Sequence, residues 1–581
     1  MVKIFKKLMV LLDKKQKRGM IGLILLMLVG AVVEACSIAV IIPVIEIVIQ
    51  PNAITENAAL NYIYTHSFFS SERVFSIAIL LSLVVAFAIK NIFLFFEQKI
   101  LYRFIFTNQF RTSERMMKNY MRRDYEYFLN ADTAVIQRSI TSDVNNMYAL
   151  IQALLQMISE IIVFVALAIV CLIADPVMTI LVASLLGVTL VIIKLILKPI
   201  LYRAGAENQE YYSGLFKWIS QTVTGIKEVK VNARERYFID EYIKCGRGYV
   251  GAVQKYTLIN NIPRLIIEVV CVAGMVAYFI NIYLSGEDVT QMIATLGAFA
   301  LALTRLMPSA NRINNYLNNI SYFEPFFMGV TDNLQDEISD VKSNVKGLDP
   351  VKEKLPVTKE IEISNINYKY PNTEKWILEN ASFSVPVGAA VGIVGTTGAG
   401  KSTIVDVMLG LLKLHSGSVK ADGVDVFEGD NYRKWLKNIG YIPQTIFMLD
   451  DTIRRNIAFG VPEEEIDENR LWEVLKEAQL DEFVKSLPDG LETGIGERGV
   501  RLSGGQRQRI SIARALYFDP EVLVLDEATS ALDNETEQAI MDSINSLHGK
   551  KTLIIIAHRL QTIEKCDAVY RIENGKAVKE R

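Results

Sequence analysis

The chain has 581 residues, 51% of them hydrophobic, and a formal net charge of −2. This length exceeds that of one domain, and the composition is more apolar than that of a typical soluble protein, which indicates membrane segments. The near-neutral charge does not support a nucleic-acid partner, because a protein that binds a duplex normally presents a basic face.

Six apolar stretches in the first 310 residues are long enough to cross roughly 30 Å of hydrocarbon. They comprise residues 20–49, 75–97, 151–174, 177–201, 263–285 and 290–309. A basic N-terminus precedes the first stretch without a small-residue cleavage site. We therefore expect a retained membrane helix there rather than a cleaved signal peptide.

The distribution of lysine and arginine orients these spans. Residues 99–149 contain eight and residues 202–261 contain nine, whereas residues 51–74 contain only Arg73. By the positive-inside tendency, both basic loops and both ends of the hydrophobic region face the cytoplasm. The loops mix charged and apolar residues at helical spacing, which predicts long helices that continue the spans into the cytoplasm, with ordinary solvated loops as the alternative.

Composition divides the chain into two domains. Residues 1–331 are predicted to form an all-α membrane domain, residues 332–357 a polar linker, and residues 358–581 an α/β domain. In the last segment, strand-like runs such as GAAVGIVG and EVLVLDE alternate with helical patterns such as KSTIVDVMLGLL.

The predicted α/β domain contains a phosphate-binding motif near its N-terminal end. The sequence GTTGAGKS fits G-x-x-x-x-G-K-[ST] between an apolar strand and a helix. Its glycines let backbone N–H groups converge on phosphate, Lys401 is suited to the β and γ phosphates, and the Ser402 hydroxyl is suited to magnesium. The predicted ATP-binding residues of this loop are Gly395, Thr396, Thr397, Gly398, Ala399, Gly400, Lys401, Ser402 and Thr403.

A second motif, EVLVLDE, is an apolar strand that ends in two carboxylates. Asp526 is suited to binding magnesium through water, and Glu527 to orienting or activating the attacking water. A surface acidic pair at the end of a strand is the alternative, and the presence of both motifs in one domain disfavours it.

Between the two motifs, residues 502–506 read LSGGQ and a helical RQRISIARALY follows. Here the chain resembles the ABC ATPase family. The resemblance assigns Tyr370 to stacking on adenine and Gln444 to sensing magnesium and γ-phosphate. It also assigns Asp533 to the loop that links two sites, and His558 to the γ-phosphate.

The resemblance also implies a dimer, because in this family the signature of one copy completes the nucleotide site of another. Since the chain carries one such domain, it is expected to act as a twofold homodimer with two hydrolytic sites. The implied signature contacts are Ser503, Gly504, Gly505 and Gln506. The implied catalytic residues are Glu527 and His558, and the implied magnesium ligands are Ser402, Gln444 and Asp526.

Six spans fused ahead of one ATPase domain resemble the exporter branch of the ABC transporters. This implies a multi-pass protein of the bacterial inner membrane whose ATPase domain is cytoplasmic. ATP would close the ATPase pair, and the long cytoplasmic helices would carry the movement. The implied contacts are the loop tips near residues 128–133 and 223–228, which would dock beside Gln444.

Ionisable residues in the predicted spans indicate the chemical class of the transported substrate. Arg305 and Arg312, seven residues apart, share one helix face, and Lys90 and Arg264 would add further cations to a cavity in the dimer. Such a cavity suits an anionic headgroup. The alternative is internal pairing, for instance of Arg264 with Glu268.

Segments such as EACSIAVIIPVIEIV, NIPRLIIEV and TRLMPSANRIN resemble bacterial flippases for lipid-linked oligosaccharides. The implied function is ATP-driven flipping of a polyprenyl-pyrophosphate-linked oligosaccharide, with a multidrug or lipid exporter as the alternative. Residues 57–69 would form a short interfacial helix near the lipid tail, or a plain structural cap. A soluble DNA-handling ATPase does not explain six spans, and the presence of Glu527 disfavours an ATP-gated channel.

Overall fold

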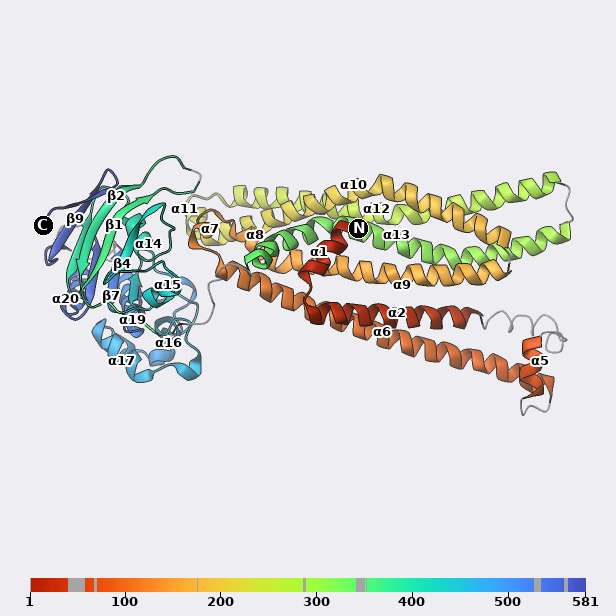
Figure 1. The fold of residues 1–581 in the computed structure, drawn as a ribbon, viewed down its shortest axis with the longest axis horizontal. Helices are drawn as coiled ribbons and strands as arrows, with labels where there is room; N and C mark the ends of the chain where they lie inside the picture. The colour runs from red at the N-terminus through yellow and green to blue at the C-terminus, as the bar shows by residue number, and fades with distance from the viewer. Residues whose placement is uncertain are drawn as a thin grey trace. The chain divides into compact units, whose positions relative to one another are not determined.

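The computed structural model describes residues 2–39, 58–66, 71–174, 176–285, 289–340, 351, 353–371, 373–526, 534–557 and 563–581. The chain divides into two compact units. A helical unit contains residues 1–122 and 131–347, and an α/β unit contains residues 348–581 together with the short segment 123–130. The predicted fold class, an all-α domain followed by an α/β domain, is confirmed (Figure 1).

Long helices make up the helical unit (Figure 1). In chain order they are α1 (Val2–Leu11), α2 (Lys14–Ala39), α5 (Ala58–Thr65), α6 (Glu72–Arg122), α8 (Thr133–Arg138), the π-helical turn η1 (Ser139–Asp143), α9 (Val144–Ala174), α10 (Pro176–Thr224), α11 (Ile226–Val231), α12 (Glu235–Ser285) and α13 (Val289–Asp340). Helix α6 has 51 residues, and at about 1.5 Å per residue it is more than twice as long as the hydrocarbon layer is thick. The basic stretches predicted to continue the spans as helices are therefore helical.

Among the described residues, α2, α6, α9, α10 and α12 contain segments that are long and apolar enough to cross a membrane. The sixth predicted span, residues 290–309, lies in α13, where side chains are described only from Leu306 onward. The part of the first predicted span beyond residue 39 lies outside the described residues.

The predicted linker begins later than expected, because α13 continues to Asp340. Two contacts explain the extension. The Leu334 side chain is fully buried, and the Asn119 amide donates to the backbone oxygen (2.9 Å) and side-chain oxygen (3.0 Å) of Asn333. Burial of Leu334 and the hydrogen bonds to Asn333 stabilise the first turn of α13 beyond residue 331. This turn has few apolar residues, so the sequence pattern does not predict it as a helix.

Helices α9, α10, α12 and α13 form a bundle, and α2 and α6 run beside each other along it (Figure 1). The buried side chains between the helices include Leu186 of α10, Ile267 of α12 and Leu306 of α13. Gly205 of α10 allows the closest approach, because an added Cβ would lie 2.0 Å from the Tyr322 carbonyl oxygen of α13. The bundle therefore packs through small and aliphatic residues, as helices in lipid do.

The α/β unit contains two sheets. The antiparallel sheet has the order β2-β1-β4-β5 and is formed by β1 (Glu360–Tyr368), β2 (Leu378–Pro386), β4 (Ser416–Ala421) and β5 (Val424–Asp425). The second sheet has the order β10-β9-β3-β8-β7-β6 and is formed by β3 (Ala390–Val394), β6 (Ile439–Ile442), β7 (Val522–Asp526), β8 (Thr552–Ile556), β9 (Ala568–Glu573) and β10 (Lys576–Lys579). All its pairs are parallel except β10 with β9.

The helices of this unit are α7 (Tyr125–Asn130), α14 (Lys401–Met408), α15 (Asn431–Leu436), α16 (Ile453–Ile457), α17 (Glu468–Glu477), α18 (Asp481–Ser486), α19 (Gly504–Tyr517) and α20 (Asn534–Asn545). Strands β3, β7 and β8 are buried at every position. Such continuous apolar runs are typical of parallel strands that are covered on both faces. The predicted strands over GAAVGIVG and EVLVLDE, and the helix over KSTIVDVMLGLL, are confirmed.

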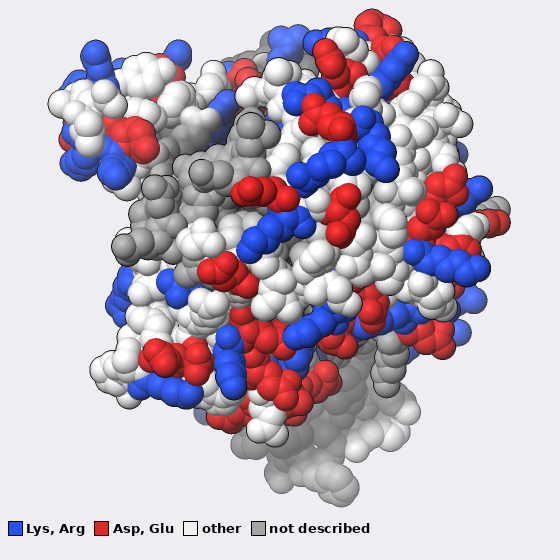
Figure 2. Space-filling model, turned by 90° about the vertical axis from the view of Figure 1, so that its left-hand side faces the viewer, with Lys and Arg blue, Asp and Glu red and all other residues white. Residues whose placement is uncertain are grey.

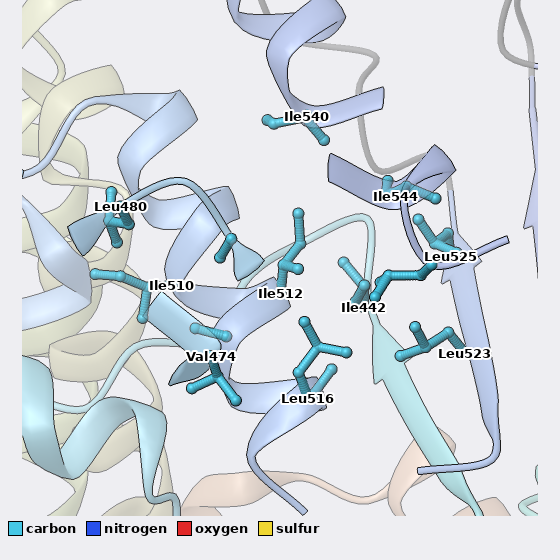
Figure 3. Packing of buried hydrophobic residues seen from close by; sticks show 14 of the residues in the cluster. Ile442, Val474, Leu480, Ile510, Ile512, Leu516, Leu523, Leu525, Ile540 and Ile544 are labelled. Carbon is cyan, nitrogen blue, oxygen red and sulfur yellow. The ribbon is translucent and has the colours of Figure 1, made fainter. Parts of the chain in front are cut away.

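Helix α19 is fixed to this sheet by an aliphatic cluster (Figure 3). Its buried residues Ile512 and Leu516 pack with Ile442 of β6 and with Leu523 and Leu525 of β7. The helix that begins directly after Ser503 is thereby held on the strand that ends in Asp526.

Charged side chains cover the face drawn in Figure 2, on which lysine and arginine lie among aspartate and glutamate. Ion pairs of the α/β unit include Lys485 with Asp481 at 2.9 Å and Lys434 with Glu353 at 2.6 Å. Exposed pairs of this kind contribute about 0–1 kcal/mol each. The interspersed signs are typical of a solvated protein surface.

Candidate functional site

The sheet topology brings the two predicted phosphate and magnesium motifs to one edge. Strands β3 and β7 are parallel and are separated by a single strand, β8. Their carboxyl ends therefore meet at the same edge of the sheet, which is where α/β folds bind ligands. Helix α14 begins at Lys401 after β3, and β7 ends at Asp526.

A cavity of 440 Å³ lies at this edge. It is lined by Tyr370, Ile377, Thr397, Gly398, Gly400, Lys401, Ser402, Thr403 and Gln444. Eight of these nine were predicted to bind ATP, and Ile377 was not. Gly395, Thr396 and Ala399 belong to the same loop but do not line the cavity.

Backbone conformation explains why the loop needs glycine. Gly398 and Gly400 have φ values of +80° and +100°, in the left-handed region that other residues rarely adopt. An added Cβ at Gly400 would lie 3.1 Å from Ile377 Cγ2 and 3.3 Å from the Ile377 oxygen. The backbone of the loop is therefore packed directly against the residue that precedes β2.

Lys401 is 5% exposed, and its ammonium group is held by the loop itself. Nζ donates to the carbonyl oxygens of Gly395 at 3.0 Å and of Thr396 at 3.3 Å. The cation therefore stands at the base of the loop beside the first turn of α14, whose free backbone N–H groups favour an anion.

Tyr370 and Gln444 lie on the wall of the same cavity, although 74 positions of sequence separate them. The Tyr370 hydroxyl lies 3.2 Å from the Thr403 hydroxyl of α14. An aromatic wall, a loop of backbone donors and one lysine together suit a nucleoside triphosphate, with the base near Tyr370 and the phosphates near Lys401.

The carboxylates at the edge lie in a confined environment. Burial, followed by the charge of Asp526, raises the pKa of Asp406 in α14 to about 6. The Tyr441 hydroxyl at the end of β6 donates to Asp526 Oδ2 at 3.5 Å. Ser402 and Gln444 add hydroxyl and amide oxygens to this edge, and oxygen donors beside a partly buried carboxylate fit the preference of magnesium.

The signature segment does not line the cavity of its own chain. Ser503 caps α19, because its hydroxyl accepts from the Gln506 N–H at 3.2 Å and the Gln506 side chain accepts from the Ser503 N–H at 2.8 Å. Ser503 and Gly504 are exposed and Gly505 is buried. The predicted residues Glu527, Asp533 and His558 lie outside the described residues.

The four predicted cavity cations differ in their surroundings. Arg312 forms a two-pronged ion pair with Glu160 of α9, with Nε 2.8 Å from Oε2 and Nη2 2.8 Å from Oε1. The Ser309 hydroxyl donates to the same carboxylate at 2.5 Å. Internal pairing, the alternative considered above, thus involves Arg312.

The other three cations were expected in the same cavity. Lys90 Nζ lies 4.7 Å from the ring centre of Phe87. Arg264 is exposed and forms no ion pair with Glu268 in the part of the chain that the structure describes. The side chain of Arg305 lies outside the described residues.

Replacing Gly400 with alanine tests the nucleotide cavity. A Cβ in the left-handed conformation costs about 1–3 kcal/mol and meets Ile377, so we expect nucleotide binding to weaken by about tenfold or more. The measurement is the Kd of a fluorescent ATP analogue for the full-length protein in detergent. Gly494→Ala is the matched control, because nothing lies within 4 Å of its added Cβ. Equal Kd values for the two variants would refute the assignment.

The raised pKa of Asp406 predicts a specific pH dependence. An unfolded aspartate ionises near pH 4, whereas this carboxyl in the folded state holds its proton up to about pH 6. Its contribution to the free energy of unfolding is therefore largest below pH 4 and is lost as the pH rises through 6. We expect Asp406→Asn to raise the thermal midpoint at pH 7.5 but not at pH 4.5.

The midpoints are measured on the full chain without nucleotide. Glu464→Gln is the control, because this carboxylate is exposed and forms no hydrogen bond or ion pair within the described ranges. A rise that is the same at both pH values would contradict the assigned burial of Asp406.

Both halves of the chain match known families. The ABC transporter transmembrane region matches residues 20–307, and the ABC transporter family matches residues 378–530. The ATP-dependent lipid A-core flippase of Saccharophagus degradans is 32% identical over 363 residues, which cover 62% of this chain and 59% of that protein. The flippase of the same name from Burkholderia pseudomallei is 32% identical over 386 residues, covering 65% of this chain and 62% of that protein.

The matched region thus spans about three fifths of the length of these relatives. A solved bacterial Atm1-family ABC exporter with ATP bound has a TM-score of 0.76 and 22% identity, covering 97% of this chain and 95% of that chain. This structural likeness shows the exporter fold. With a transmembrane region followed by an ATPase domain, each matched by its own family, the protein belongs to the ABC transporters.

Proposed function

We propose that this protein is an ATP-driven exporter that flips an anionic, lipid-linked substrate across the bacterial inner membrane. The favoured substrate is an oligosaccharide linked to a polyprenyl pyrophosphate. The observation that carries the proposal is the fusion of a helical unit to a domain with a nucleotide cavity. The helical unit contains apolar helices long enough to cross a membrane, and an oriented arginine in α13.

ATP hydrolysis supplies the driving force in this proposal. Tyr370 stacks on the base and Lys401 binds the phosphates, which their places in the cavity support. Ser402, Gln444 and Asp526 would hold magnesium, which supplies positive charge against the phosphate oxygens. Glu527 orients the attacking water and His558 contacts the γ-phosphate, roles taken from the family resemblance.

A homodimer is part of the same proposal. Ser503 and Gly504 are exposed at the start of α19 and are absent from the cavity of their own chain. The Ser503 hydroxyl and the Gly504 N–H can therefore donate to a nucleotide bound by another copy. Asp533 would lie in the loop between the two sites. Each copy would then contribute one phosphate loop and one signature to the pair.

The ion pair of Arg312 with Glu160 supports a phosphate-containing substrate. Glu160 uses the Nε and Nη2 edge of the guanidinium group, and Nη1 forms no hydrogen bond within the described residues. The Arg312 side chain is 48% exposed. Glu160 therefore fixes the orientation of the guanidinium while the opposite edge stays open, which is the arrangement that suits two-pronged binding of a phosphate.

Lys90, Arg264 and Arg305 are proposed as further cations for the same anionic group. In the described residues, two of these side chains can reach an anionic group. Arg264 is exposed, and the ammonium group of Lys90 lies over the apolar ring of Phe87. An anionic diphosphate would compensate their charge in the low-dielectric membrane interior.

The lipid tail is proposed to contact α5, the short helix after the first span. Its residue Tyr62 is 67% exposed, and its ring lies against that of His66, with ring centres 4.3 Å apart and planes tilted by 31°. Aromatic residues of this kind favour the membrane interface. The relatives named above act on lipid A-core, which supports a lipid carrying polar groups. A multidrug or lipid exporter without an anionic headgroup is the alternative.

Removing the guanidinium of Arg312 tests the proposed substrate class. We expect Arg312→Ala to slow the flipping of a polyprenyl-pyrophosphate-linked oligosaccharide by about tenfold or more, because a charge-assisted phosphate contact contributes about 1.5–3 kcal/mol. The measurement is flipping in proteoliposomes, with ATP hydrolysis recorded in the same sample. Arg236→Ala is the control, since the side chain of Arg236 is 84% exposed on the first turn of α12.

Unchanged flipping by the double variant Arg305→Ala with Arg312→Ala would overturn the anionic-headgroup proposal. Transport of an uncharged amphiphile by the wild type, at the same rate with and without these arginines, would favour the alternative exporter.

A further inference from the structure

In helix α7, one carboxylate oxygen of Glu126 bonds to two distant segments of the α/β unit. The segment 123–130 follows the long helix α6 in the chain but packs with residues 348–581 in one compact unit. Glu126 Oε1 accepts from the Tyr368 hydroxyl at 3.1 Å and from the Lys413 backbone N–H at 3.0 Å. Both donors lie more than 240 positions away in the sequence.

Tyr368 connects this carboxylate to the nucleotide cavity. It is the last residue of β1, and its side chain is fully buried. Its ring meets the Tyr370 ring edge to face, with centres 5.3 Å apart and planes at 83°. Burial, followed by the charge of Glu126, raises the pKa of Tyr368, so the phenol stays protonated and remains a donor.

The second donor, Lys413, lies in the loop after α14. It follows α14, the helix that begins at Lys401, by five residues. Thr403 of α14 is in turn 3.2 Å from the Tyr370 hydroxyl. Glu126 therefore bonds to the end of β1 and to the loop after α14. Tyr368 of β1 and Thr403 of α14 both contact Tyr370.

We propose that Glu126 and Tyr368 are positioning residues that couple occupation of the base site at Tyr370 to the hold of the α/β unit on α7. A base stacked on Tyr370 would restrict the ring that packs on Tyr368. The Tyr368 hydroxyl would then keep its alignment with Glu126. The family match assigns neither residue a role.

Linkage gives this coupling a testable form. If a bound base strengthens the contact with α7, then that contact must strengthen nucleotide binding by the same factor. Removing the Glu126 side chain takes away the acceptor of the buried Tyr368 hydroxyl. Removing the Tyr368 hydroxyl leaves the same carboxylate oxygen with the Lys413 N–H. Either change breaks the same connection, so the two effects should not multiply.

The test uses the full-length protein in lipid nanodiscs with a non-hydrolysable ATP analogue. We expect Glu126→Ala and Tyr368→Phe each to raise the Kd of the analogue about threefold or more, and the double variant to match the stronger single one. Glu126→Gln keeps an oxygen acceptor for both donors and should restore a Kd close to that of the wild type.

Hydrogen exchange of residues 123–130 gives a readout that is independent of affinity. At saturating analogue, exchange in this segment should slow in the wild type and in Glu126→Gln but not in Tyr368→Phe. The matched control is Tyr570→Phe, which removes the hydroxyl that donates to the Ser384 oxygen at 3.4 Å elsewhere in the unit. It should behave as the wild type does.

Two results would overturn the proposal. One is the same nucleotide-dependent slowing in Tyr368→Phe as in the wild type. The other is a double variant whose Kd equals the product of the two single effects, which would mean that Glu126 and Tyr368 act separately. Neither result bears on the transported substrate, so the proposed flippase function stands or falls independently.

Discussion

The parallel pairing of β3, β8 and β7 is the constraint on which the nucleotide site depends. Parallel strands that are buried on both faces must be apolar in their interior, as these strands are between their terminal residues. Polar chemistry is therefore confined to the strand ends. Because all three strands run in one direction, the loop before α14 and the carboxylate of Asp526 meet at one edge.

The same sheet controls the second nucleotide element. The aliphatic side chains of α19 pack on β6 and β7, which fixes the helix and leaves its capped first turn exposed (Figure 3). The signature at the start of α19 does not line the cavity of its own chain, which supports the proposal that it serves a nucleotide bound by a second copy. In the helical unit, the Glu160 carboxylate is 12% exposed, and Arg312 supplies the opposite charge that its burial requires.

Most of the correct predictions of strands, helices and cavity residues came from local sequence patterns. Apolar runs, glycines and motif spacing predicted β3, β7, α14 and six residues of the cavity, because each of these signals lies within a few positions of the chain. The other two predicted cavity residues, Tyr370 and Gln444, were assigned only through the family resemblance. Ile377 is a lone apolar residue outside any motif and gave no such signal. The pair of Glu160 with Arg312 joins positions 152 apart, and sequence reasoning considered only a local partner, Glu268 for Arg264.

The packing of α7 also depends on contacts between residues far apart in the chain, which local sequence patterns do not predict. The loop near residue 128 was expected to contact the ATPase domain beside Gln444, and the segment 123–130 does pack with that domain, with its described hydrogen bonds at Tyr368 and Lys413. The contact depends on a buried tyrosine hydroxyl, which no periodicity marks. The docking expected for residues 223–228 remains a prediction.

The central claim is that each ATP is shared by two identical chains. It is tested by mixing a Lys401→Ala chain with a Ser503→Glu chain and measuring ATP hydrolysis of the isolated mixed dimer. If the sites are shared, one site keeps both intact residues, so hydrolysis returns, while a dimer of wild type with the Lys401→Ala/Ser503→Glu chain stays inactive. The reverse outcome, an inactive mixed dimer and an active second dimer, would show that each chain completes its own site.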